Sequence, residues 1–345
     1  MTAVMALHVL ILLYVFQEIR SPPSFLVWKG ALWIWSRLFP VKTAQCLARP
    51  YHVTHKPSNE TFAIFQIYNR PLPPALDTWW GLSAALCAHY ASRHGYHYQY
   101  LFVSGTDGFV HYGHRRRTLH WARIPIMRQI LLKQSFNWFL YLDIDAMVNP
   151  TQLQYPLTWI LSSAQTEPPC IIRGNSRPTP DLIFFSNAPG EQHMPCSGIF
   201  MSSQNSASSL DIWWQHPVHE YFDQNSEFDQ HSLHEALYFY PQSVFKVLVM
   251  DIRGFDFHTD SSFFLHFSGQ RDSGNRTINR HFYHTLRTRI FKALGPTGLH
   301  QLTTQPILQQ SCWFDNSDEE IKPYCITVDE AQRQEIEKIH WSKAE

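Results

Sequence analysis

Residues 138 to 142 form an apolar run that stops at two aspartates, Asp143 and Asp145, which are separated by one residue. An apolar run of this length is typical of a strand that helices cover on both faces. Alternate side chains of an extended segment point to the same side, so both carboxylates are expected to reach one point beyond the end of the strand. The run therefore predicts a buried strand that presents two carboxylates at the edge of a sheet.

Segments with the patterns of strands and helices alternate around this run. Strands are expected at 62–68, 98–103 and 138–142, and helices at 78–94, ended by Gly95, and at 118–133, kinked or restarted at Pro125. This alternation indicates an α/β domain around a mainly parallel sheet, in which ligands bind beyond the carboxyl ends of the strands. The later part is less regular, with strands expected at 170–173, 182–186, 198–202 and 244–250 and helices at 206–215 and 229–238.

Two carboxylates in this position suit a divalent cation. Mg²⁺ and Mn²⁺ take hard oxygen ligands, and either ion would bridge and neutralise a diphosphate. Such an ion acts as a Lewis acid on the leaving group. Two acids in a surface loop are, however, more often solvated or cap the next helix, so the pair alone leaves both interpretations open.

Composition restricts the partners of the chain. It carries 28 basic residues (Lys plus Arg) and 28 acidic ones, so no bulk charge attracts nucleic acid, and we expect no nucleic-acid partner. Two local features keep two interpretations each. The basic cluster at 115–117 could hold phosphate or lie solvated in a loop, and Trp213 and Trp214 could stack on a sugar or belong to the core.

The N-terminal segment is apolar from residue 3 to 16, and a second, Trp-rich stretch at 25–39 has the character of an interfacial helix. Basic residues follow the first stretch and none precedes it, which opposes a simple N-in anchor. Exposing so many Leu, Val and Trp side chains to the cytosol is costly. We therefore expect residues 1–57 to hold a membrane anchor or signal followed by a stem.

Two N-glycosylation sequons, at Asn59 and Asn275, indicate exposure to the lumen of the secretory pathway. We expect a type II membrane glycoprotein of the Golgi or another secretory-pathway membrane. Its catalytic domain at 58–300 would be lumenal, and 301–345 would form a C-terminal extension. The 6 cysteines permit disulfides, and Cys312 with Cys325 is the pair we favour.

Several short motifs occur in an order that is specific in combination. Residues 121–128, followed by 138–147, resemble the Golgi glycosyltransferase family that contains fungal galactosyl- and mannosyltransferases and plant xyloglucan xylosyltransferases, glycosyltransferase family 34. One block upstream, at 90–96, is similar to a motif of that family. Further blocks downstream are similar to its later motifs, in the same order, at 197–200, 210–214, 229–230 and 266–269. The likeness spans residues 61 to 285. It implies the GT-A fold, a Rossmann-like mainly parallel sheet flanked by helices, with a D-x-D metal site and retention of anomeric configuration.

The resemblance also implies a role for each matching residue. Asp145 would be the main metal carboxylate, Asp143 would contact the metal, the ribose or both, and His266 would give Mn²⁺ a neutral imidazole nitrogen. The remaining positions would bind the donor or act at the reacting carbon. Arg271 would hold the diphosphate, Arg123 would touch the nucleotide, Ser197, Gly198 and Gly269 would line the donor pocket, and Asp229 and Gln230 would be catalytic.

Two departures from the family pattern concern the sugar and the acceptor. At the position of Cys196, many members of the family look to have Asn or another small polar residue. At the position of Phe228, just before Asp229, the plant members look to have an acidic residue. Neither change touches the expected metal ligands. The sequence thus predicts a metal-dependent enzyme, with Mn²⁺ or Mg²⁺, that moves a hexose or pentose from a UDP- or GDP-sugar to a glycan acceptor with retention.

Two other classes of protein remain as alternatives. A haloacid dehalogenase-like phosphatase also places D-x-D after an apolar strand, with the first Asp as nucleophile. That family usually has Thr or Val two residues after the second Asp, where this chain has Met147, and it later supplies an adjacent acidic pair that we do not find here. A non-catalytic sugar-binding protein could keep the same residues, and only turnover separates it from an enzyme.

Overall fold

The computed structural model describes residues 60–73, 76–103, 109–112, 115–166, 180–186, 195–216, 228–240, 244–250, 262–267, 276–307, 309–314 and 323–327. The expected anchor and stem at 1–57, the acceptor asparagines of both sequons and the expected strand at 170–173 lie outside these residues. None of the helices within the described ranges combines the length and the apolar character that a membrane span requires.

A mixed sheet organises the described residues, with the strand order β12-β11-β2-β1-β5-β8-β7-β9. Parallel pairs join β11, β2, β1 and β5, and β7 with β9, whereas β8 runs antiparallel to both β5 and β7, and β12 is antiparallel to β11. The α/β class is therefore confirmed, with parallel strands at the centre. The bounds are β1 Phe62–Tyr68, β2 His97–Val103, β5 Trp138–Asp143, β7 Leu182–Ser186, β8 Pro195–Ser203, β9 Val247–Met250, β11 Gln309–Phe314 and β12 Pro323–Thr327.

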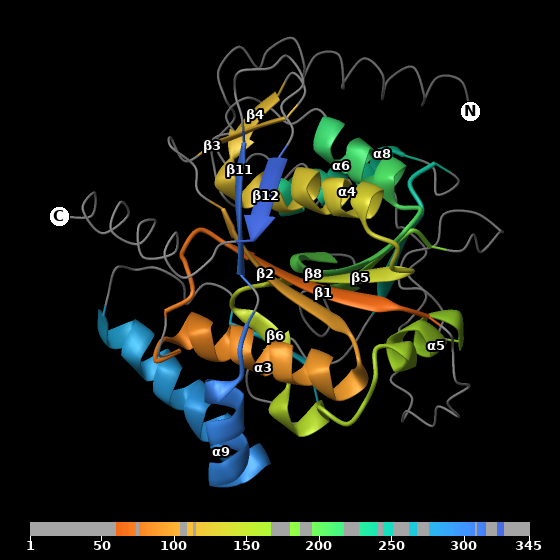
Figure 1. Cartoon of the computed structure of the whole chain (residues 1–345). Coiled ribbons are helices and arrows are strands. Elements are labelled where there is room, and N and C mark those ends of the chain that lie inside the picture. Colours follow the sequence, from red (N-terminus) through yellow and green to blue (C-terminus); the bar gives the residue numbers. More distant parts are fainter. Residues whose placement is uncertain are drawn as a thin grey trace, which may run out of the picture. The chain divides into compact units, whose positions relative to one another are not determined.

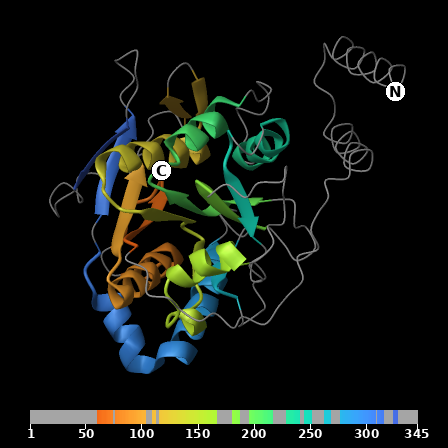
Figure 2. The ribbon, with the colours of Figure 1, turned by 90° about the vertical axis from the view of Figure 1, so that its right-hand side faces the viewer.

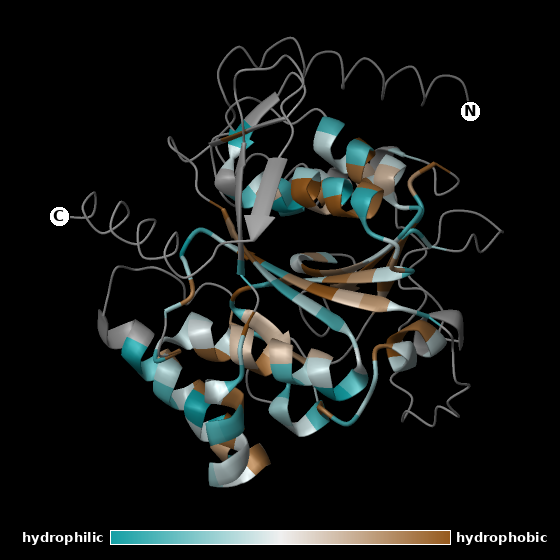
Figure 3. Ribbon diagram, viewed as in Figure 1, coloured by the Kyte–Doolittle hydropathy of each residue, from teal (hydrophilic) through white to brown (hydrophobic). Residues whose placement is uncertain are grey.

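Helices cover both faces of this sheet (Figures 1 and 2). Helices α3 (Trp79–His94) and α9 (Arg276–Thr304) lie on one face, and α4 (Arg123–Lys133), α6 (Ala207–Gln215) and α8 (Phe228–Phe239) lie on the other. The strand side chains alternate between two cores. In β1, for example, Phe62 and Ile64 pack in the core of α3 and α9, while Ala63 and Phe65 pack in the core of α4 and α6. Burial on both faces explains why β1 and β5 are apolar throughout most of their length (Figure 3).

Helix boundaries follow the signals in the sequence. Helix α3 begins after Thr78, whose side chain accepts a hydrogen bond from the Gly81 N–H, and ends at Gly95 in the left-handed conformation with φ of 69°. The helical stretch expected at 118–133 is divided into a 3₁₀ turn, η1 (Leu119–Ala122), and α4. Pro125 falls in the first turn of α4, where its missing N–H has no intrahelical partner to lose.

The segment expected as a loop before η1 contains an antiparallel hairpin of β3 (Phe109–Tyr112) and β4 (Arg115–Thr118). Arg117 is fully buried there, with its guanidinium 3.7 Å from the centre of the Trp121 ring. It donates hydrogen bonds to the carbonyls of Trp214 and His216 at the end of α6. Arg117 is therefore neither a phosphate ligand nor a solvated loop residue, and Trp213 and Trp214 belong to the core.

Several elements were not predicted. These are the short strands β6 (Ala146–Val148) and β10 (Phe264–His266), the turn η2 (Pro150–Gln152), the helices α5 (Thr158–Thr166) and α9, and the strands β11 and β12. The strands β11 and β12 lie beyond residue 300 and extend the edge of the main sheet. Their register places Cys312 directly opposite Cys325, a Cα separation that a disulfide can span. The disulfide itself stays a prediction.

Candidate metal centre

Asp143 is the last residue of β5 and continues the face of the strand that Phe139 and Tyr141 begin. The Tyr141 hydroxyl donates to Oδ1 of Asp143 over 2.5 Å. The chain then turns at Ile144 and Asp145 and enters β6. We expected one extended segment to align the two carboxylates, but the strand ends at Asp143. A turn brings Asp145 near Asp143 instead.

The two-stranded sheet of β6 and β10 brings His266 to the carboxylates. Antiparallel pairing sets His266 opposite Ala146, the residue after Asp145. The Phe267 N–H donates to the carbonyl of Asp145 over 3.0 Å, so β10 is hydrogen bonded to the turn itself. A residue far away in the sequence is thus fixed beside Asp143 and Asp145.

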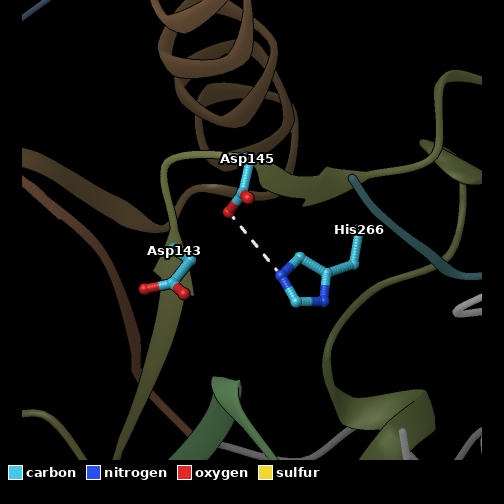
Figure 4. Close-up of side chains that lie close together, drawn as sticks. All are labelled: Asp143, Asp145 and His266. Atoms are coloured by element: carbon cyan, nitrogen blue, oxygen red, sulfur yellow. Dashed lines mark ion pairs between the residues drawn. The ribbon is translucent and has the colours of Figure 1, made fainter. Parts of the chain in front are cut away.

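The side chains of Asp143, Asp145 and His266 lie close together (Figure 4). One ligand atom from each lies within 4.8 Å of the others, and all three residues are buried. Nε2 of His266 is 3.6 Å from Oδ1 of Asp145. Two carboxylates and one imidazole at this spacing are able to hold a divalent cation.

Gln66 positions the turn that carries the two carboxylates, a role that was not predicted from the sequence. Its side-chain amide donates to the carbonyls of Asp143 and Ala146, at 3.4 and 3.1 Å, and thereby holds both ends of the turn that carries the carboxylates. Its own carbonyl accepts a hydrogen bond from the Tyr98 hydroxyl. A single Gln within the otherwise apolar strand β1 was the available signal, because a buried amide needs partners.

An irregularity in β8 shapes the opposite wall of the centre. The pairing of β7 jumps from Phe200 to Cys196 of β8, so the intervening residues 197–199 bulge. This stretch contains Ser197, whose carbonyl accepts from Nη1 of Arg123 over 2.9 Å. It also contains Gly198, where an added Cβ would stand 2.7 Å from Oδ2 of Asp143 and 3.2 Å from Cε1 of His266. Only a residue without a side chain fits this close approach.

Arg123 connects the metal centre with α8. Its Nη1 is 3.2 Å from Oδ1 of Asp143, and its Nε is 3.4 Å from Oδ2 of Asp229. All three side chains are buried. Asp229 lies in the first turn of α8, and its carbonyl accepts a hydrogen bond from the indole of Trp213 in α6. A chain of alternating charges therefore runs from the centre to the start of α8.

Most of the site residues expected from the sequence are thus brought together. Asp143, Asp145 and His266 lie together, and an added Cβ on Gly198 would meet two of them. Arg123 contacts Asp143, Asp229 and the carbonyl of Ser197. Gln230 is half-buried beside Asp229 in α8. Gly269 and Arg271 lie outside the described residues, so their expected roles stay predictions.

The pKa of His266 is raised well above its ordinary value. Burial is the largest influence and lowers this pKa, but electrostatic interactions and hydrogen bonds with Cys196 and Asp145 together outweigh it. A raised pKa in the folded state means that protonated His266 stabilises the fold at low pH, a contribution lost as pH rises through that pKa. A cation needs the neutral ring instead, so protons compete with it.

Metal affinity is therefore expected to rise with pH, by about tenfold per pH unit while His266 is still protonated in the metal-free protein. Titration of the full chain with Mn²⁺ at several pH values, followed by electron paramagnetic resonance, measures this slope. His266→Gln removes the competing proton and should flatten the profile, whereas His300→Gln, at an exposed position of α9, should preserve it. A wild-type affinity independent of pH would contradict the assignment of His266 as a ligand.

No protein-family model and no curated protein matches the chain. Among solved structures, the chain is similar to a glycosyltransferase involved in the glycosylation of the major capsid of PBCV-1, with a TM-score of 0.47 and 19% identity over 66% of this chain and 99% of that one. It is also similar to the glycosyltransferase GlyE of Streptococcus pneumoniae TIGR4, with a TM-score of 0.35 and 12% identity over 70% of this chain and 64% of that one. Both likenesses are distant, and the family resemblance stays a prediction.

Proposed function

We propose that the chain is a metal-dependent glycosyltransferase that moves a hexose or pentose from a UDP- or GDP-sugar to a glycan acceptor. The observation that carries this proposal is the convergence of Asp143, Asp145 and His266 at the carboxyl end of a central strand, with ligand atoms within 4.8 Å of one another. In α/β sheets this edge is where ligands bind. Retention of configuration is proposed from the sequence resemblance alone.

The residues present fit a divalent cation. Oδ1 of Asp143 is occupied by Tyr141 and Arg123, while Oδ2 is the atom that an added Cβ on Gly198 would approach. Carboxylate oxygens suit both Mg²⁺ and Mn²⁺, and the imidazole nitrogen favours Mn²⁺, since Mg²⁺ prefers oxygen ligands throughout. When bound, the cation would neutralise the diphosphate and stabilise it as a leaving group.

The remaining residues would act on the donor and on the charge that develops. We propose that Arg123 acts by holding Asp143 and Asp229 in place, because its guanidinium is buried between their carboxylates. Asp229 and Gln230 would lie toward the reacting carbon, where a carboxylate or amide stabilises an oxocarbenium-like transition state. Ser197, Gly198 and Gly269 would line the donor pocket, and Arg271 would hold the departing diphosphate.

The geometry disfavours the phosphatase alternative. A nucleophilic aspartate needs a carboxylate oxygen directed at a phosphorus atom. In this chain, Oδ1 of Asp143 is held by Tyr141 and Arg123, and Oδ2 lies beside Gly198, where an added Cβ would stand 2.7 Å away. These contacts suit a carboxylate that serves as a fixed ligand.

The proposal is tested with the full chain, Mn²⁺, a panel of UDP- and GDP-sugars and a mixture of glycan acceptors. Nucleoside diphosphate release should fall on the order of 10²- to 10³-fold in Asp145→Ala. Asp211→Ala serves as the control, because this carboxylate pairs with Arg128 between α4 and α6 and is 38% exposed. Release that persists in Asp145→Ala disproves the site. Binding of a sugar nucleotide in the presence of Mn²⁺ without its turnover would instead identify a sugar-binding protein, and phosphate release from a phosphomonoester would identify a phosphatase.

We also propose that the chain is held in the Golgi or another secretory-pathway membrane by its N-terminal segment, with the catalytic domain in the lumen. The apolar stretches at 3–16 and 25–39 and the sequons at Asn59 and Asn275 support this placement. Glycosidase treatment of the cellular wild-type protein should increase its electrophoretic mobility, and untreated Asn59→Gln should also migrate faster than untreated wild type. If neither change alters the mobility, lumenal exposure is contradicted.

A further inference from the structure

Cys196 contacts the candidate ligand His266 on the side of the ring away from the carboxylates. Its Sγ lies 3.5 Å from Nδ1 of His266, whereas Nε2 of the same ring is 3.6 Å from Oδ1 of Asp145. The imidazole is therefore held between a thiol and a carboxylate. Cys196 itself is 1% exposed, and it carries no disulfide.

We propose that Cys196 is a positioning residue for the metal centre, which orients the His266 ring and fixes its tautomer so that the Nε2 lone pair faces the cation. This inference rests on the proposed metal site. A ligating histidine binds through one ring nitrogen, and a hydrogen bond at the other nitrogen decides which one is available. In this arrangement Nδ1 carries the hydrogen and donates it to the sulfur.

The backbone of β8 explains how the thiol reaches this position. Cys196 is the residue at which pairing with β7 resumes after the bulge at 197–199. Next to the bulge, the Cys196 side chain lies against His266, and Gly198 lies close enough that an added Cβ would stand 3.2 Å from Cε1 of the same ring. Gly198 thus leaves space for the His266 ring, and Cys196 contacts it.

The chemistry of sulfur gives this contact a distinct character. Metal-bound histidines usually donate their second N–H to a carboxylate, a backbone carbonyl or water, which are stronger acceptors than a thiol. Partners of this kind contribute about 10- to 100-fold to metal affinity. A serine hydroxyl preserves the hydrogen bond, whereas an alanine leaves a buried N–H without an acceptor.

The test measures the affinity of the full chain for Mn²⁺ alone in four proteins: wild type, Cys196→Ala, Cys196→Ser and Cys87→Ala. Cys87 is the matched control, because it is also a buried free cysteine but lies in the core of α3. We expect Cys196→Ala to weaken binding by about tenfold, the lower end of that range because a thiol is the weaker acceptor, and Cys196→Ser to remain within about threefold of wild type. Cys87→Ala should lower thermal stability and leave the affinity unchanged.

A spectroscopic readout separates positioning from general packing. In the Zn²⁺-loaded wild type, labelled with ¹⁵N-histidine, the Nδ1–H proton of His266 should exchange slowly with water. It should stay protected in Cys196→Ser and be lost in Cys196→Ala. A change in thermal stability alone would not move this signal.

The outcomes distinguish this inference from the proposed function. If wild type binds no Mn²⁺, the metal site itself is wrong. If wild type binds and Cys196→Ala binds equally well, only the role of Cys196 is overturned. Equal losses in Cys196→Ser, Cys196→Ala and Cys87→Ala would also overturn it, since they would show a packing effect. Cys196→Ser decides the question if Cys196→Ala does not fold.

Discussion

Replacing Gly198 with alanine is expected to weaken Mn²⁺ binding by about 10- to 100-fold, the range seen when the groups that orient metal ligands are disturbed. The added Cβ would stand 2.7 Å from Oδ2 of Asp143 and 3.2 Å from Cε1 of His266. Neither neighbour is the end of a flexible chain, since Tyr141 and Arg123 hold the carboxylate and β10 holds the ring. Calorimetric titration with Mn²⁺ measures the loss.

A second glycine provides the control for this substitution. Gly95 has a φ of 69°, and an added Cβ there would meet no atom within 4 Å. Gly95→Ala should therefore cost stability of about 1 kcal/mol and leave Mn²⁺ affinity unchanged. If both alanine variants bind Mn²⁺ as tightly as wild type, the close approach at Gly198 has no role in the centre.

Replacing Arg123 with methionine is expected to lower the free energy of unfolding by about 3–5 kcal/mol, because removing one member of a buried charge network leaves the others uncompensated. The carboxylates of Asp143 and Asp229 would lose the cation that lies between them, at 3.2 and 3.4 Å. Urea unfolding of the full chain, followed by circular dichroism, measures the change. Metal binding should weaken as well, because Oδ1 of Asp143 loses one of its two anchors.

The same helix offers a matched control. Arg128 in α4 pairs with Asp211 at 2.5 Å, with side chains that are 30% and 38% exposed. Solvent screening limits such a pair to about 0–1 kcal/mol, so Arg128→Met should have a small effect. A loss in Arg123→Met no larger than that in Arg128→Met would show that the buried charges do not hold the fold together.

The sequence predicted those elements whose signals are local. Strands β1 and β7 have the expected bounds, since each is a run of apolar side chains buried on both faces. Helix α3 lies between Thr78 and Gly95, whose capping roles are visible in the sequence. The carboxylate pair follows its strand as expected, because a run that ends in two acids marks the edge of a sheet.

Features that depend on residues distant in the chain were not visible. Strands β6 and β10 have three residues each, too few for any periodicity, and they form only because they pair with each other. The position of His266 follows from that pairing, so only the family resemblance pointed to it. The bulge in β8 and the burial of Arg117 between two tryptophans likewise depend on tertiary packing, which the local sequence around these residues does not predict.

If Asp143, Asp145 and His266 bind a cation as proposed, the short pairing of β6 with β10 would couple ion uptake to folding. Two of the candidate ligands lie where β5 ends in a turn, and the third lies on a three-residue strand from a distant part of the sequence. An unfolded polypeptide cannot assemble such a set, so a cation at 100 times its dissociation constant would add about 2.7 kcal/mol to the stability of the native state. The supply of the ion in the surrounding compartment would then help to set the fraction of the chain that is folded.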